Sequence, residues 1–105
     1  MDILDELKYL KGETLRTLDR GNRFDVLDVN TMGVIIKPLS TRKERLIPKK
    51  GPDGAFRELV AIGQITRTQI EEKHSPRNPV YVTALLAELP GVRYSIRPID
   101  LRYQR

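Results

Sequence analysis

Basic side chains are concentrated in one part of this chain. Residues 37–57 contain seven lysines and arginines but only two acidic residues, whereas residues 1–36 contain five basic and seven acidic residues. The seven basic residues are Lys37, Arg42, Lys43, Arg45, Lys49, Lys50 and Arg57. Clustered positive charge is typical of surfaces that bind a polyanion, because phosphate groups attract it over long distances. The segment therefore favours nucleic acid as a partner, although a solvated loop can have the same composition.

Arg42, Lys43 and Arg45 lie in a stretch that we expect to form a hairpin between two strands. Basic side chains at the tip of a hairpin can contact the phosphate backbone or enter a narrow minor groove. Charged residues also protect an edge strand from pairing with other chains. The sequence favours neither interpretation over the other.

A helix start near residue 66 carries residues that suit phosphate binding. Thr66 and Gln69 have the spacing of a capping box, in which each side chain accepts a hydrogen bond from the backbone amide of the other residue. The remaining free amides at such a helix end attract anions. We therefore expect Arg67, Thr68 and Gln69 to contact phosphates of a nucleic acid.

A further helix start is predicted at Pro79, because proline is favoured at the first position of a helix. Arg77 and Asn78 precede it. Arginine suits a guanine edge and asparagine an adenine edge, so this pair is a candidate for base contacts. Asn78 is also explained as the N-cap of the helix, and Arg77 as a solvated residue.

Catalytic chemistry has little support in the sequence. Pro52-Asp53 and Glu71-Glu72-Lys73 fit the loose Pro-Asp…Glu-X-Lys spacing of a metal-dependent nuclease family. That chemistry needs carboxylates and a lysine converging on magnesium, but side chains two apart on a helix diverge. His74, the only histidine, has no serine or carboxylate spaced to form a catalytic set with it. There is no cysteine and no glycine-rich phosphate or dinucleotide motif, so we expect no enzyme, metal or cofactor.

Apolar spacing and turn residues predict a single α+β domain over residues 1–105. Asp2 caps a first helix whose stripe of Ile3, Leu4, Leu7 and Leu10 either packs in the core, which we favour, or pairs with a second copy. Alternating runs between residues 14 and 48 predict a three- to four-stranded antiparallel meander. The loop at 49–54 separates this subregion, residues 1–50, from a second one at 51–105.

The second subregion is predicted to contain three helices and a short β-ribbon. The first helix opens at Asp53 or Gly54 and closes at Gly63, which suits a helix end. The second begins after Thr66 and the third after Asn78. A Pro90-Gly91 turn then leads into extended segments at 92–98 and 99–103.

This order of elements over residues 54–103 resembles the winged helix-turn-helix superfamily of DNA-binding proteins. The resemblance lies in the pattern of elements and covers nearly half of the chain. It implies a recognition helix at about Pro79–Leu89 in the major groove. The residues that it would present outward are Arg77, Asn78, Tyr81, Thr83 and Ala84, and the wing and flank contacts would be Arg93, Arg97 and Arg102.

The pattern and the charge together predict a non-enzymatic protein that binds double-stranded DNA, such as a small prokaryotic or phage regulator or accessory factor. The six aromatic residues form no stacking platform, which favours duplex over single-stranded nucleic acid. No apolar stretch approaches the roughly 18 residues of a membrane span. The start of the chain lacks a signal-peptide pattern, so we expect a cytoplasmic protein. The alternatives are a protein-interaction or assembly module, with a homodimer or protein partner held by the N-terminal helix, and a component of an RNA–protein particle.

Overall fold

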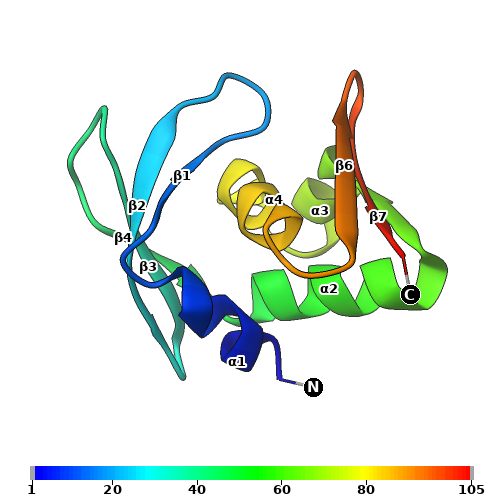
Figure 1. Ribbon diagram of the computed structural model, residues 1–105, viewed down its shortest axis with the longest axis horizontal. Coiled ribbons are helices and arrows are strands. Elements are labelled where there is room, and N and C mark those ends of the chain that lie inside the picture. The colour runs from blue at the N-terminus through cyan, green and yellow to red at the C-terminus, as the bar shows by residue number, and fades with distance from the viewer. Residues whose placement is uncertain (1, 105) are drawn as a thin grey trace.

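Figure 1 shows a computed structural model of the chain, which describes residues 2–104. Within this range a four-stranded antiparallel sheet lies on one side, and three helices with a three-stranded antiparallel sheet lie on the other (Figure 1). A short N-terminal helix precedes the larger sheet. The predicted α+β class is confirmed, and the elements that were predicted occur in the predicted order. None of the helices within residues 2–104 has the length and apolar character needed to cross a bilayer.

The N-terminal helix α1 spans Ile3–Leu7 and continues into a short 3₁₀ helix, η1, at Lys8–Leu10. The Asp2 side chain accepts a hydrogen bond from the Leu4 amide at 3.0 Å, as its predicted role of N-cap requires. Ile3, Leu4 and Leu7 are all buried within the chain. The stripe therefore belongs to the core and is not available for pairing with a second copy.

The meander consists of four strands in the order β1-β2-β3-β4. Their bounds are Thr14–Arg16, Arg23–Asn30, Gly33–Pro38 and Arg45–Pro48. Pro38 and Pro48 are the last residues of their strands, as predicted from the amide that proline lacks. The register shifts between Val26 and Asp28, so a bulge at Leu27 explains the break in alternation along β2. Gly33 lies so close to β4 that any side chain there would collide with the Ile47 carbonyl oxygen.

The second half begins with helix α2 at Lys50–Ile62 and ends with a smaller sheet in the order β5-β7-β6. The remaining bounds are Gln64–Thr66 for β5, Arg67–Lys73 for α3, Pro79–Ala87 for α4, Val92–Ile96 for β6 and Ile99–Tyr103 for β7. Helix α2 begins at Lys50 rather than at Asp53 or Gly54, because Pro52 fits its first turn, where a missing amide costs nothing. Strand β5 was not predicted; its three residues pair with residues 100–102 of β7.

Helix α4 lies between the two sheets (Figure 1). Five consecutive residues in its middle, Val82–Leu86, are buried. Tyr81 contacts the Phe24 ring of β2 edge-on, with 5.2 Å between ring centres. The helix contains no charged residue between Pro79 and Ala87, and a helix that is apolar on all faces is stable only when it is covered on all faces. The core of the molecule is therefore built around α4.

Candidate nucleic-acid interface

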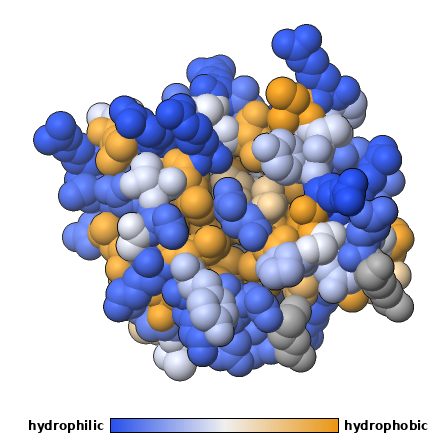
Figure 2. Space-filling model, viewed as in Figure 1, coloured by the Kyte–Doolittle hydropathy of each residue, from blue (hydrophilic) through white to orange (hydrophobic). Residues whose placement is uncertain are grey.

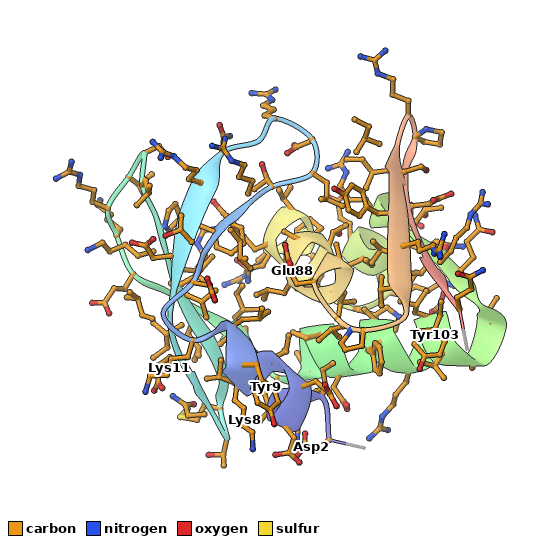
Figure 3. The ribbon with its side chains drawn as sticks, viewed as in Figure 1. Asp2, Lys8, Tyr9, Lys11, Glu88 and Tyr103 are labelled. Atoms are coloured by element: carbon orange, nitrogen blue, oxygen red, sulfur yellow. The ribbon has the colours of Figure 1, made fainter. Side chains whose placement is uncertain are left out.

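Helix α4 corresponds to the predicted recognition helix, and the prediction that it presents its middle outward is wrong. Thr83 is 1% exposed and Ala84 is 2% exposed. The Thr83 hydroxyl donates to the Pro79 carbonyl at 2.6 Å, so its polar group is satisfied inside the helix. Insertion of this helix into a DNA groove is excluded while the four-stranded sheet covers it. Only its ends reach the surface, and Figure 3 shows Glu88 at its C-terminal end, in front of the helix.

Three connections between strands point to the same side of the molecule (Figure 1). They join β1 to β2 at residues 17–22, β3 to β4 at residues 39–44, and β6 to β7 at residues 97–98. We call this side the tip face. It carries the exposed cations Arg20, Arg42, Lys43 and Arg97. Arg42 and Lys43 of the predicted hairpin and Arg97 of the predicted wing thus lie on one side, although they come from distant parts of the chain.

Arg45 is held in place at the N-terminal end of α4. It is the first residue of β4 and, like Ile47, points toward the helices, because alternate residues of a strand share a face. Its Nη1 donates to Oδ1 of Asn78 at 3.2 Å, and its guanidinium carbon lies 5.4 Å from the centre of the Tyr81 ring. The side chain stays exposed while these two contacts fix its direction.

Asn78 and Tyr81 therefore support Arg45. Asn78 is 6% exposed and its carbonyl oxygen accepts from Arg45, so a paired contact to an adenine edge would require this bond to break, and that contact stays a prediction. It stands at the N-cap position of α4, but its side chain makes no capping hydrogen bond. Tyr81 is half-buried between Phe24 and the guanidinium of Arg45. The electrostatic attraction between that cation and the ring face favours this arrangement.

Three depressions meet around Arg77 and Asn78, which line all of them, and we call them together the α4 groove. Their volumes are about 280, 340 and 380 Å³. The basic residues that line the α4 groove are Arg20, Arg45, Lys50 and Arg77. Asp19 is the only acidic residue among the described residues that line it. The α4 groove is thus a concave basic surface at the N-terminal end of α4, where arginines from neighbouring segments surround the helix.

Arg67 lies close enough to Asp19, which lines the α4 groove, for its charge to act on the carboxylate. Burial raises the pKa of Asp19, but hydrogen bonds from the Arg20 amide and the Thr17 hydroxyl, together with the charge of Arg67, outweigh it, so that the pKa falls below its usual 3.8. Asp19 is therefore ionised at neutral pH and offsets part of the positive charge. The loop that carries it is closed by the buried hydroxyl of Thr17, which accepts from the Asn22 amide at 3.1 Å.

At the start of α3, some of the hydrogen-bonding groups are already used by the capping box. The predicted capping box is present: the Gln69 amide donates to the Thr66 hydroxyl at 3.1 Å, and the Thr66 amide donates to Oε1 of Gln69 at 2.9 Å. The acceptor of Gln69 is therefore engaged, whereas Thr68 is exposed. Arg93 and Arg102 face each other across β6 and β7. These strands lie across α4 from the four-stranded sheet (Figure 1), so this pair is separate from the α4 groove.

His74 has a partner that its sequence neighbourhood did not indicate. Its Nε2 lies 2.9 Å from Oε1 of Glu58, and Nζ of Lys73 lies 3.4 Å from the other carboxylate oxygen. The hydrogen bond with His74 is the main reason that the pKa of Glu58 lies below its usual 4.5. These contacts join α3 to α2. Asp53 pairs instead with Arg57, so the residues of the nuclease-like spacing do not converge.

Sequence reasoning missed Arg20 as a member of the candidate surface. It lies in the part of the chain with an acidic excess, and only the fold brings it to Arg45 and Arg77. The burial of α4 did have a sequence signal, because the helix lacks charge on every face. Comparisons of the chain with protein-family models, with curated proteins and with solved structures find no match. The chemistry of the α4 groove and the tip face is therefore the basis for inferring a function.

Proposed function

We propose that this protein binds double-stranded DNA without catalysing a reaction, and that the α4 groove and the tip face contact its phosphates. The observation that carries the proposal is the convergence of Arg20, Arg45 and Arg77 from three separate segments on one concave surface. Lys50 extends the same surface at the start of α2. Phosphate contacts supply most of the affinity of sequence-independent DNA binding, and such a cluster provides cations for these contacts.

The fixed position of Arg45 supports a role in binding rather than in solvation. A guanidinium that is already held by Asn78 and Tyr81 loses less conformational entropy when it binds an anion. Its planar group can donate two parallel hydrogen bonds to one phosphate. Arg77, which is exposed next to it, can contact the same or the neighbouring phosphate.

The dimensions of the molecule suit a duplex. The longest axis measures 34 Å, and the connections of the tip face are spread along it (Figure 1). One turn of B-form DNA is about 34 Å long, so the tip face can reach phosphates on both sides of a groove. The element order from α2 to β7 supports a winged-helix arrangement. Because α4 is covered, however, we assign the contacts to the arginine-bearing surfaces and not to an inserted helix.

The proposal is tested by fluorescence anisotropy of a labelled random-sequence duplex with 5′-hydroxyl ends, titrated with the full chain. If about five phosphates are neutralised, the log–log slope of affinity against salt should lie near −4 to −5. Arg77→Glu should weaken binding several-fold and reduce the slope by about one. Lys8→Glu is the matched control, because Lys8 is an exposed cation at the end of the molecule opposite the tip face (Figure 3).

Two results would overturn the proposal. One is the lack of binding to any duplex at low salt. The other is an equal loss of affinity in Arg77→Glu and Lys8→Glu, which would mean that only net charge matters. Competition with a structured RNA at the same salt concentration distinguishes duplex DNA from RNA as the partner.

An assembly module is the second candidate, and a second groove favours it. Tyr94 is 55% exposed and Ile96 is 52% exposed on β6, an edge strand of the smaller sheet. With Leu18 and Ala87 they line a groove of about 450 Å³ between β1 and β6. Figure 2 shows apolar residues in the centre of this face, with hydrophilic residues around them. Two copies could pair through β6, and sedimentation of the wild type and Tyr94→Asp would reveal whether a dimer exists and depends on this strand.

A further inference from the structure

The largest of the three depressions in the α4 groove lies at the N-terminal end of α2. Its volume is about 380 Å³, and it is bounded by the start of α2 on one side and by the α3–α4 connection on the other. The residues that line it are Pro48, Lys50, Gly51, His74, Ser75, Pro76, Arg77 and Asn78. We refer to it as the α2 cavity.

The start of α2 presents unpaired amides to this cavity. The Asp53 amide donates to the Lys49 carbonyl, and Pro52 has no amide hydrogen. The amides of Lys50 and Gly51 have no acceptor within residues 2–104, and no side chain caps the helix. Helix α2 has 13 residues, and the positive end of its dipole attracts an anion.

Two buried side chains independently supply donors that have no partner. Ser75 is 6% exposed, and its hydroxyl makes no hydrogen bond with any residue that the structure describes. Asn78 is equally buried, and Arg45 occupies its carbonyl oxygen, so its amide nitrogen is the end left without an acceptor in the described chain. Within the described chain, every fully enclosed side-chain nitrogen or oxygen has a hydrogen-bond partner. Because the Ser75 hydroxyl and the Asn78 amide nitrogen have none, neither atom is fully enclosed. Among the three depressions Ser75 lines only this cavity, so its hydroxyl reaches it, and Asn78 stands where the three depressions meet.

The charge of the cavity completes a set of donors for an anion. Lys50 and Arg77 are cationic, and no carboxylate is among the described residues that line it. A Cβ atom at Gly51 would lie 3.2 Å from Cβ and 3.3 Å from Oγ of Ser75, a tight contact that would push the hydroxyl by a few tenths of an ångström. With glycine at this position, the Ser75 hydroxyl lies close to the start of α2.

We propose that the α2 cavity binds the phosphoryl group of a phosphate monoester. A terminal phosphate has three unshared oxygens and carries between one and two negative charges at neutral pH. Two helix amides, two buried side-chain donors and two cations can satisfy those oxygens from several directions. A diester within a strand has only two unshared oxygens and one charge, so it would leave donors unpaired. This site goes beyond the binding of backbone phosphates by the α4 groove.

The first experiment is a titration of the ¹⁵N-labelled full chain with inorganic phosphate at constant ionic strength, followed by NMR. We expect saturable shifts centred on the amides of Lys50, Gly51 and Ser75 and on the side-chain amide of Asn78. Ser75→Ala should weaken phosphate binding about tenfold, as expected for a lost hydrogen bond to a charged group. Ser95→Ala, the same change on the exposed strand β6, should leave it unchanged. Lys50→Gln, at an exposed position, tests the charge with little risk to the fold.

The second experiment identifies the source of the phosphoryl group. A nucleoside monophosphate and a pair of otherwise identical duplexes, one with 5′-phosphate and one with 5′-hydroxyl ends, compete with inorganic phosphate. Binding of the monophosphate alone points to a small metabolite, whereas a several-fold preference for the phosphorylated duplex points to a strand end. Either result supports the monoester site. Equal competition by both duplexes, together with none by the monophosphate, overturns it.

The site is also overturned if phosphate causes no saturable shifts, or if Ser75→Ala binds phosphate as tightly as the wild type does. These outcomes are separable from those for duplex binding. A chain that binds 5′-hydroxyl duplex but not phosphate retains the proposed function and loses the cavity site. A chain that binds phosphate in the cavity but no 5′-hydroxyl duplex retains the cavity site and loses the proposed function.

Discussion

Helices α3 and α4 follow each other in the chain and both begin with a clear start signal, but they occupy different environments. Helix α3 buries only Ile70, and its outer face exposes Thr68, Glu71 and Glu72. Helix α4 buries every residue from Val82 to Leu86. Start signals therefore locate a helix along the chain, whereas the distribution of charge around it decides which of its faces other elements cover.

The difference bears directly on function. Of the seven residues of α3 four are charged, whereas none of the nine residues of α4 is charged. A helix that reads DNA needs an exposed polar face, and α4 lacks one along most of its length. Its two ends remain accessible to a ligand, and of these the N-terminal end lies beside Arg45 and Arg77.

The strongest test of this comparison places the same charge on each helix. Ala84→Arg should destabilise the fold by more than about 4 kcal/mol or prevent folding, because it buries an unpaired charge and overfills the core. Thr68→Arg on the exposed face of α3 should change stability by less than about 0.5 kcal/mol. Urea denaturation followed by circular dichroism measures both. Similar midpoints for the two variants would show that α4 is not the covered helix.

Truncation of an apolar side chain should have the next largest effect. Leu85 is fully buried in α4, and Leu85→Ala should cost about 2–5 kcal/mol through lost burial and a residual cavity. Ile62 is 71% exposed at the end of α2, so Ile62→Ala serves as the control. Thermal and urea unfolding should separate the two clearly. A small loss for Leu85→Ala would mean that the core does not depend on α4.

The capping box of α3 is expected to contribute less. Thr66→Ala removes the acceptor for the Gln69 amide and should destabilise the chain by about 1 kcal/mol. Thr68→Ala, two residues along on the exposed side, should have a much smaller effect. If both variants lose the same stability, the capping box makes no specific contribution to the position of α3.

The smallest effect concerns pH and the link between α3 and α2. The folded pKa of Glu58 lies below its usual 4.5, so its ionised form stabilises the fold above that pH and the contribution is lost as the pH falls through the folded pKa. Glu58→Gln should cost about 0.5 kcal/mol near neutral pH, the lower end of the range for a hydrogen bond. The difference from wild type should shrink below pH 4.5. Unfolding free energies measured across this range test the sign, and a constant or growing difference would contradict it.

Local rules account for much of what the sequence predicted correctly. The strand ends at Pro38 and Pro48 and the capping box at Thr66 follow from hydrogen-bonding groups within a few residues. Strand β5 is defined by pairing with a segment more than 30 residues away, and three residues provide no usable periodicity. The grouping of Arg20 with Arg45 and Arg77 is non-local in the same way.

The burial of α4 could have been predicted from its composition. The order of elements favoured a recognition helix, but the uncharged run from Pro79 to Ala87 argued for an element covered on all sides. The partners that cover it, the meander on one side and α2 on another, could not be chosen from the sequence. That choice depends on how the two halves pack together and not on either half alone.

The location of α4 between the sheets also bears on how this chain can be divided. A fragment that starts near residue 50 would retain every element of the second half but would expose the apolar face of α4 to water. We expect such a fragment to aggregate, and to fold into a soluble form only when residues 1–49 are added back as a separate peptide. Circular permutation, which keeps both halves, should be tolerated far better than excision. We therefore expect the two halves to be transplantable only together.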